Sequence, residues 1–282
     1  MSEALEKPVR NEARDLGRPF RFALLCHQRS GSNALSGLLR NEPEIKLYGQ
    51  LFNHFLHYRY RNFRLGVGRY TAPQDAMRHF GLRPPPATRL TRAIVSLTPK
   101  HATLDDFMDA FWQKFHAERM TGALGFKLHD FQISDDDLAS LSRDHVDGVV
   151  MLWRRNRLKA AVSWAYAIKT DVWSLRNDAK NERPVHELDP NEIQWFIEKT
   201  TFQVNNWRRI LCETGANWIE LTYEDDIVTR NLERLYRFLG VAYQGPPAFK
   251  TQRLSTSRYQ HVANAEDIER QLASSETGSL FD

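Results

Sequence analysis

Short apolar runs alternate with helix-like patterns along the chain. Residues 20–28 form an apolar run that predicts a buried strand, and apolar residues return at helical spacing over about 32–41. Runs at 122–131 and 147–154 predict two more strands, and a helical stretch over about 158–168 follows the second. Strands that alternate with helices in this way predict a parallel sheet covered by helices on both faces.

The last third of the chain repeats the pattern. Residues 216–226 predict a strand that ends in acidic residues. Four apolar positions then recur at i, i+3, i+4 and i+7 before a glycine, and they are Leu232, Leu235, Tyr236 and Leu239. We therefore expect an α/β fold with three layers, α/β/α, around a central, mostly parallel sheet. The simplest organisation is a single domain over 20–282 behind a polar lead-in at 1–19.

One segment departs from this alternation. Residues 57–100 combine a basic-aromatic stretch (HYRYRNFRLGVGRY) with a proline-rich turn (LRPPPATR), which favours a lid or an insertion over a core element. The stretch 57–70 has the ingredients of a surface for single-stranded nucleic acid. We favour a wall of the substrate site or a solvated lid over a nucleic-acid surface for this stretch, so we expect no nucleic-acid partner.

Composition narrows the class of partner. The 282 residues carry a formal net charge of +4 and a pI of about 9.1, which favours anionic partners without the basicity of a dedicated nucleic-acid binder. The two cysteines, Cys26 and Cys212, predict no disulfide framework and no metal cluster, and they favour a reducing compartment. The charged N-terminal stretch has no apolar core, and no run approaches roughly 18 apolar residues. We expect a cytoplasmic protein with no membrane span.

The turn between the first strand and its helix carries candidate chemistry. A strand, the tight turn 28-QRSGSN-33 and a helix surround one point with backbone N–H groups, which can bind a phosphate or a sulfate. Nucleotide kinases and GTPases need G-x-x-x-x-G-K-[ST] at this place, whereas Gly31 is the only glycine here and the cation, Arg29, precedes it. A serine-capped turn with an exposed arginine is the plain alternative.

A second element follows the strand at 147–154. Arg155 lies where this strand ends, and Ser163 lies eight residues later, about two turns into the next helix. A long arginine side chain and a helix hydroxyl at this spacing can close on a second phosphate, away from the first. Taken alone, the pair is equally explained by an arginine at a helix start and a packed serine.

Together these two elements resemble the sulfotransferases that use 3′-phosphoadenosine 5′-phosphosulfate (PAPS). The resemblance implies a P-loop-like fold with a short loop for the 5′-phosphosulfate, matched at 29–33, and an Arg…Ser pair for the 3′-phosphate. YGQLFN at 48–53 is similar to the family's G-E-[LIF]-F-N segment. Residues 157–173 resemble a helix of bacterial carbohydrate sulfotransferases of the trehalose 2-sulfotransferase and nodulation-factor type. The resemblance covers about residues 20–272.

The resemblance implies a set of donor-binding residues. They are Arg29, Ser30, Gly31, Ser32, Asn33, Arg155, Ser163, Arg253, Ser255 and Arg258, the last three in a nucleotide-covering C-terminal loop at about 251–264. Arg29 is also the expected catalytic cation, because sulfuryl transfer builds charge on the leaving phosphate oxygen. Many relatives have a lysine at this position. A fixed cation suffices for the monoanionic sulfuryl group, so we expect no metal.

The base that removes the proton of the acceptor differs from that of the carbohydrate enzymes. Where the carbohydrate enzymes have a glutamate, this chain has Gln50, which cannot take a proton. Lys127 and His129 resemble the Lys-x-His pair of many cytosolic sulfotransferases, and a histidine with an ordinary pKa near 6.5 suits a base. His54 and His57 are reserve candidates. The expected substrate-binding residues are Gln50, Asn53, His54 and Trp173.

We expect a transferase that moves the sulfuryl group of PAPS, by in-line transfer, to a hydroxyl of a carbohydrate, a glycan or another small hydroxylated molecule. One alternative is a catalytically silent PAPS-binding scaffold that lost its base, as Gln50 would indicate. Another is a phosphate-transferring P-loop enzyme, which the missing second glycine and lysine disfavour. The acceptor, the site of its modification and the oligomeric state stay open, with a homodimer as one alternative.

Overall fold

The structure of the protein is a computed structural model. It describes residues 18–50, 52, 69–70, 100–101, 103–116, 122–172, 184–246 and 259–281. Most of the segment 57–100 and residues 251–258 of the C-terminal loop therefore lie outside the described residues. Within 57–100 the structure describes only residues 69–70 and 100. They belong to the short strands β3 (Arg69–Tyr70) and β4 (Lys100–His101), which pair with each other in parallel.

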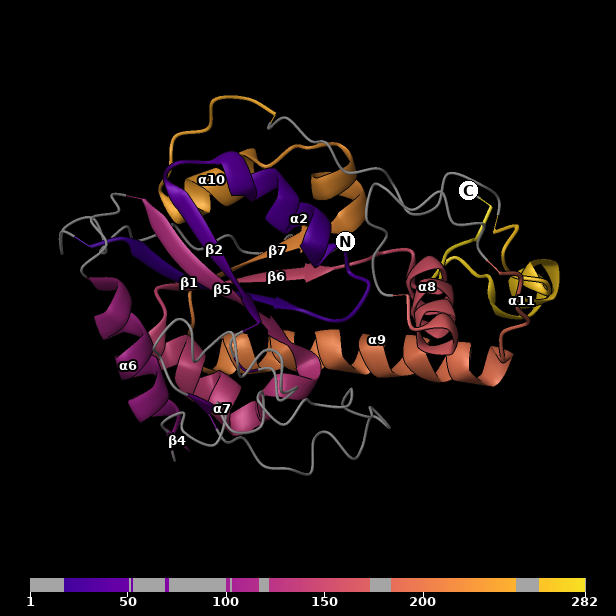
Figure 1. Ribbon diagram of the computed structural model, residues 1–282, viewed down its shortest axis with the longest axis horizontal. Helices are drawn as coiled ribbons and strands as arrows, with labels where there is room; N and C mark the ends of the chain where they lie inside the picture. The colour runs from indigo at the N-terminus through magenta and orange to yellow at the C-terminus, as the bar shows by residue number, and fades with distance from the viewer. Residues whose placement is uncertain are drawn as a thin grey trace, which may run out of the picture.

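A five-stranded parallel sheet forms the centre of the molecule (Figure 1). Its strands are β1 (Phe20–Cys26), β2 (Ile45–Gln50), β5 (Ala123–His129), β6 (Gly148–Trp153) and β7 (Trp218–Thr222). They lie in the order β2-β5-β1-β6-β7, and every neighbouring pair is parallel. The predicted α/β fold around a parallel sheet is confirmed.

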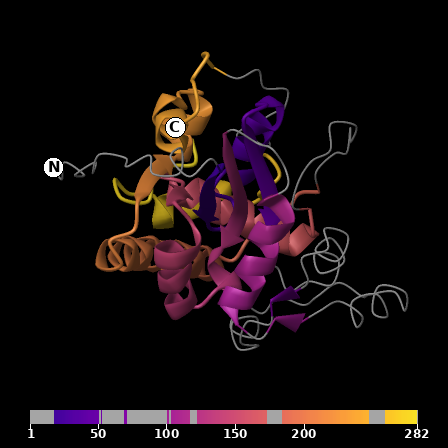
Figure 2. The same cartoon turned by 90° about the vertical axis from the view of Figure 1, so that its left-hand side faces the viewer.

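Helices cover the sheet on both faces, as Figure 1 and the rotated view in Figure 2 show. The described helices are α2 (Ser32–Leu38), α6 (Leu104–His116), α7 (Asp135–Ser140), α8 (Arg157–Thr170), α9 (Pro190–Glu213), α10 (Glu233–Leu239) and α11 (Ala265–Leu272). Short 3₁₀ or π-helical turns follow at η1 (Leu39–Asn41), η2 (Asp130–Gln132), η3 (Leu141–His145) and η4 (Tyr223–Val228). Helices α2 and α10 lie on one face of the sheet, and α6, α7 and α9 lie on the other.

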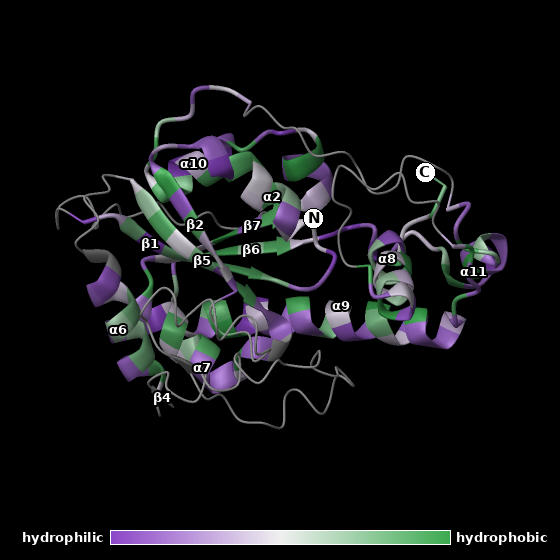
Figure 3. Ribbon diagram, in the orientation of Figure 1, coloured by the Kyte–Doolittle hydropathy of each residue, from purple (hydrophilic) through white to green (hydrophobic). Residues whose placement is uncertain are grey.

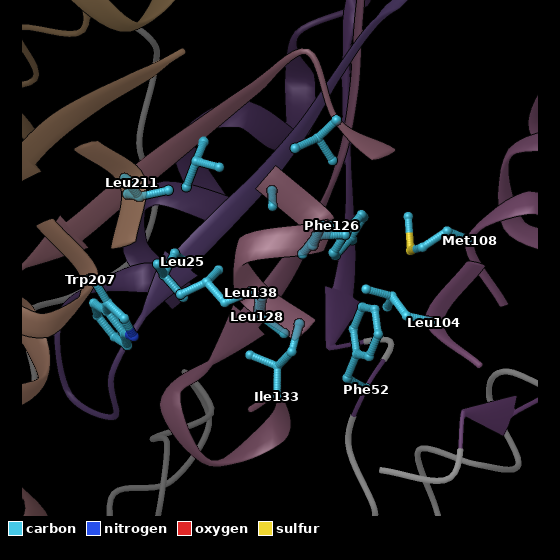
Figure 4. Packing of buried hydrophobic residues seen from close by; sticks show 14 of the residues in the cluster. Leu25, Phe52, Leu104, Met108, Phe126, Leu128, Ile133, Leu138, Trp207 and Leu211 are labelled. Carbon is cyan, nitrogen blue, oxygen red and sulfur yellow. The ribbon is translucent and has the colours of Figure 1, made fainter. Parts of the chain in front are cut away.

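Alternating side chains of the strands build a separate core on each face. On β1, Leu24 and Cys26 pack toward α2 and α10, whereas Ala23 and Leu25 pack toward α6 and α9. Figure 3 shows the strands as mostly hydrophobic, as expected for a sheet covered on both sides. Figure 4 shows the core on the face covered by α6, α7 and α9, to which β5 contributes Phe126.

Local signals define the helix ends. Asn156 caps α8 by accepting a hydrogen bond from the Lys159 backbone N–H, at 2.9 Å. Asp189 caps α9, and Pro190 occupies its first turn. Gly240 adopts a left-handed conformation (φ 68°) after α10, which confirms the predicted glycine end of that helix.

The chain changes direction between β1 and β6. After β1 it passes through α2 to β2, toward one edge of the sheet, whereas after β6 it passes through α8 and α9 to β7 at the other edge. In open parallel sheets, such a switch point leaves a crevice at the carboxyl ends of the two strands, where ligands bind. The turn after β1 and the turn after β6 therefore meet at the place where the fold favours a ligand.

A bulge in β2 decides where Gln50 lies. Tyr48 pairs with Phe126 of β5 in regular register, but the next paired residues are Gln50 and Lys127, so Gly49 is an extra residue. Residues directly opposite each other in neighbouring strands share a face of the sheet. The bulge therefore brings Gln50 to the same face as Lys127.

No helix among the described residues is long and apolar enough to cross a membrane.

Candidate active site

The turn after β1 has a strained backbone that only particular residues tolerate. Arg29 and Gly31 both have positive φ, at 63° and 94°. A Cβ atom on Gly31 would lie 2.3 Å from a ring carbon of Tyr223. Glycine is thus required twice, by its backbone conformation and by its contact with the ring. The turn packs firmly on η4, and as the N-cap residue of α2, Gly31 offers no side chain to the first N–H groups of that helix.

Arg29 joins the two motifs that the sequence analysis singled out. Its Nε donates a hydrogen bond of 2.9 Å to Oγ of Ser163 on α8. The two residues are 134 positions apart in sequence and come from the two sides of the switch point. The guanidinium is thus oriented at the carboxyl ends of β1 and β6, the place where the fold favours a ligand.

Lys127 reaches the same turn from β5. The buried end of this strand places the Lys127 ammonium 2.7 Å from Oδ1 of Asn33, to which it donates a hydrogen bond. Only 5% of Lys127 is exposed, so its charge lies in a poorly hydrated environment. The structure therefore brings together four of the predicted residues, namely Arg29, Asn33, Lys127 and Ser163.

His129 ends β5, two residues after Lys127, and lies opposite Cys26 in the register with β1. It is buried, and this burial, together with the nearby Lys127 charge, lowers its pKa to about 3. The expectation of an ordinary pKa near 6.5 is therefore wrong. A ring with this pKa is neutral at physiological pH, and it is a weaker base than an ordinary histidine.

Gln50 is tied to the end of β5 through a second glutamine. Nε2 of Gln132 donates a 3.0 Å hydrogen bond to Oε1 of Gln50, and Oε1 of Gln132 accepts a 2.9 Å hydrogen bond from the His129 backbone N–H. Gln132 is completely buried. Sequence analysis missed this residue, although its position three residues after His129, at a strand end, was an available signal for a cap.

Arg155 and Ser163 are not in contact with each other in this structure. Arg155 forms an ion pair with Asp225, and both side chains are more than half exposed. The neighbouring Glu224 accepts hydrogen bonds from the backbone N–H groups of Arg155 and Asn156, at 2.8 and 3.2 Å. A shared role of Arg155 and Ser163 at a 3′-phosphate stays a prediction, and it requires Arg155 to leave Asp225.

Two further groups at this end of the sheet were not predicted. Arg154 stacks over the Tyr223 ring at 4.9 Å and lies 3.5 Å from Glu224, so it supports the ring on which Gly31 packs. On the opposite face, the carboxylate of Asp130 is buried and lies 3.0 Å from Nζ of Lys199. Neither group belongs to a short sequence motif, because each depends on elements that are distant in sequence.

Several predicted site residues lie outside the described residues. They are Asn53, His54, His57, Trp173, Arg253, Ser255 and Arg258. Their roles stay predictions. Ser30 and Ser32 are described and buried, and both belong to the turn after β1.

The described residues contain no group of three or more His, Cys, Asp or Glu side chains that could hold a metal ion. The site instead offers a fixed guanidinium, a buried ammonium and a neutral imidazole. The two cations suit the binding of an anionic group.

Comparisons with known proteins add little to this description. No protein-family model and no curated protein matches the chain. Among solved structures, the crystal structure of a sulfotransferase from Alicyclobacillus acidocaldarius is similar over 84% of this chain and 86% of that chain, with 16% sequence identity and a TM-score of 0.44. This degree of similarity carries no argument about activity, so the functional argument depends on the residues themselves.

Proposed function

We propose that the protein is a PAPS-dependent sulfotransferase that acts in the cytoplasm on a hydroxyl of a carbohydrate or another small hydroxylated acceptor. The observation that carries the proposal is the hydrogen bond between Arg29 and Ser163, because it joins the two predicted anion-binding motifs at the switch point of the sheet. The cysteines Cys26 and Cys212 are both free thiols, which supports a reducing compartment.

The turn at 29–33 is the proposed binding site of the 5′-phosphosulfate. Arg29 holds the bridging and sulfuryl oxygens, with Lys127 beside them through Asn33. Arg155 is the proposed partner of the 3′-phosphate. A surface ion pair such as Arg155 with Asp225 is worth only about 0–1 kcal/mol, so breaking it costs little when a phosphate takes the place of the carboxylate.

The proposed reaction has three linked changes. The acceptor hydroxyl oxygen forms a bond to sulfur, the bond between sulfur and the 5′-phosphate oxygen breaks in line with it, and the hydroxyl proton passes to the neutral ring of His129. Charge grows on the leaving phosphate oxygen during this step. Arg29 and Lys127 stabilise that charge more than they stabilise the ground state, which is the condition for catalysis.

A catalytically silent PAPS-binding scaffold is the second candidate. The observation that favours it is Gln50, whose amide cannot take a proton and whose oxygen already accepts a hydrogen bond from Gln132. The two candidates share the nucleotide site and differ only in turnover.

Calorimetry followed by a transfer assay tests the proposal. We expect tight binding of adenosine 3′,5′-bisphosphate and weaker binding of ATP, and then transfer of label from ³⁵S-PAPS to at least one member of a panel of sugars and small alcohols. Bisphosphate binding without transfer to any acceptor supports the scaffold. A preference for ATP contradicts both candidates.

A further inference from the structure

The two glutamines near His129 form a chain with a defined direction. Gln132 accepts a hydrogen bond from the His129 backbone N–H at 2.9 Å, and it donates one to Oε1 of Gln50 at 3.0 Å. Gln132 is completely buried, whereas Gln50 is partly exposed. Gln50 is therefore the end of the chain that lies nearer the surface.

The backbone fixes this direction. A backbone N–H can only donate, so the amide oxygen of Gln132 has to face His129 and its nitrogen has to face Gln50. Gln50 must then meet that nitrogen with its own oxygen. The opposite orientation of Gln132 would leave the buried His129 N–H without an acceptor, which costs about 1–3 kcal/mol.

The orientation of Gln50 follows from its planar amide. Because Oε1 faces Gln132, Nε2 is directed away from Gln132. The bulge in β2 places Gln50 opposite Lys127, on the face of the sheet where Lys127 meets Asn33 of the turn after β1. The N–H groups of Gln50 therefore lie at the end of β2, on the face of the sheet that carries the candidate site.

We infer that Gln132 is a positioning residue that holds the Gln50 amide with its N–H groups toward the acceptor substrate. This inference rests on the proposed function. Position 50 then binds an oxygen of the acceptor instead of removing its proton. The acceptor class that fits is one with a second oxygen beside the reacting hydroxyl, as in a vicinal diol of a sugar.

The orientation is testable on the free protein, without any assay of activity. Neutron diffraction from crystals grown in D₂O locates the deuterium atoms of both amides. We expect two deuterium atoms on the Gln132 nitrogen, one of them directed at the Gln50 oxygen. Deuterium on a Gln50 nitrogen that points at Gln132 overturns the inference, whether or not the protein transfers sulfuryl groups.

A kinetic experiment tests the consequence for the acceptor. The variant Gln132→Glu keeps an acceptor for the His129 N–H. Because burial raises the pKa of the new carboxyl, the assay is run at alkaline pH, where the ionised carboxylate attracts the Gln50 nitrogen and so reverses the Gln50 amide. With trans-cyclohexane-1,2-diol and cyclohexanol as probe acceptors at saturating PAPS, we expect wild type to have the lower KM for the diol. Gln132→Glu should raise the KM for the diol about tenfold, the effect of losing one hydrogen bond, and leave the KM for cyclohexanol unchanged.

Two controls separate positioning from a general defect. Gln194→Glu makes the same chemical change on α9, where Gln194 is half-buried and donates a hydrogen bond to Glu198, and it should alter neither KM. Adenosine 3′,5′-bisphosphate should bind Gln132→Glu within about twofold of wild type. Equal KM values of wild type for the two probes overturn the assignment of the acceptor class. Absence of turnover with both probes overturns it as well. An equal rise of both KM values in Gln132→Glu overturns the positioning role.

Discussion

The turn after β1 and the turn after β6 both carry an arginine that the sequence assigns to a phosphate, but their surroundings differ. Arg29 is held by Ser163, and its turn is packed against Tyr223 through Gly31. Arg155 is exposed and neutralised by Asp225. The first turn is therefore organised before a ligand arrives, whereas the proposed role of the second requires Arg155 to exchange Asp225 for a phosphate. We expect rate to depend on the first turn and affinity for the 3′-phosphate to depend on the second.

The largest effect is expected next to the first turn, at the proposed base. His129→Ala should lower kcat by about 10²–10⁴, the usual contribution of a general base, with little change in nucleotide affinity. Because burial lowers the pKa of His129 to about 3, the ring stays neutral as the pH falls from 8 to 5, and the wild-type rate should show no imidazole titration in this range. Steady-state kinetics against pH measures both. A rate that falls through pH 6.5 in wild type, or full activity in the variant, contradicts the assignment.

Arg29→Ala should reduce kcat by about 10²–10³, as expected for the loss of one donor that stabilises developing charge. Binding of adenosine 3′,5′-bisphosphate should weaken far less, because this product carries no charge that exists only in the transition state. Arg29→Lys is the matched control, since it keeps the charge and loses the fork geometry. If rate and product affinity fall by the same factor, Arg29 is a binding residue only.

The rigidity of the first turn predicts a cost for any side chain at its glycine. Gly31→Ala combines a positive φ, which costs about 1–2 kcal/mol, with overpacking against Tyr223, which costs about 1–3 kcal/mol. Gly215→Ala is the control, because Gly215 also has positive φ but has no neighbour within 4 Å. Urea unfolding should show a drop in the free energy of unfolding of about 2–5 kcal/mol for Gly31→Ala and about 1–2 kcal/mol for Gly215→Ala. Equal losses would show that the turn can yield to a methyl group.

The second turn should govern recognition of the 3′-phosphate. Arg155→Ala should weaken adenosine 3′,5′-bisphosphate by about 1.5–3 kcal/mol and leave AMP, which lacks the 3′-phosphate, almost unaffected. Arg143→Ala is the matched control, because Arg143 also forms an exposed ion pair, with Asp144, but lies before the start of β6, whereas Arg155 follows its end. Calorimetry measures all four affinities. Equal weakening of both nucleotides by Arg155→Ala would remove the assignment.

The smallest effect is expected from the partner of Arg155. Asp225→Asn removes the carboxylate that competes with the phosphate, and a surface ion pair is worth at most about 1 kcal/mol. The bisphosphate should therefore bind up to about fivefold more tightly, with the difference shrinking as salt rises. Weaker binding would show that Asp225 orients Arg155 instead of competing for it.

The sheet was largely predictable because its buried strands are short apolar runs. β1, β5, β6 and β7 each lie within a predicted run, since both faces of a parallel strand are covered. β2 was not singled out, because its residues IKLYGQ mix polar with apolar positions at the edge of the sheet. α9 was not singled out either, because two helices follow β6 in succession and the alternation of strands and helices does not anticipate the second.

The site was predictable in its residues but not in its pairs. Arg29, Asn33, Lys127 and Ser163 come together as candidate residues, but the partner of Ser163 is Arg29, not Arg155. Sequence spacing shows which residues share a helix or strand end. It does not show which side chains from different elements meet, because the directions of the strands and the helix that follows decide that. The pKa of His129 was unpredictable for the same reason, since it follows from burial.

The extra residue in β2 has a consequence for how this chain tolerates changes in length. In a regular strand, inserting or deleting one residue turns every later side chain to the other face of the sheet. At Gly49 the strand has already taken up one such residue, and Gln50 lies opposite Lys127 because of it. A chain shortened by Gly49 would continue regularly from Tyr48 and still place its glutamine opposite Lys127. A gap at this position in an alignment of relatives would therefore be neutral for the site, whereas a gap one or two residues earlier would exchange the side chains that face the core and the site.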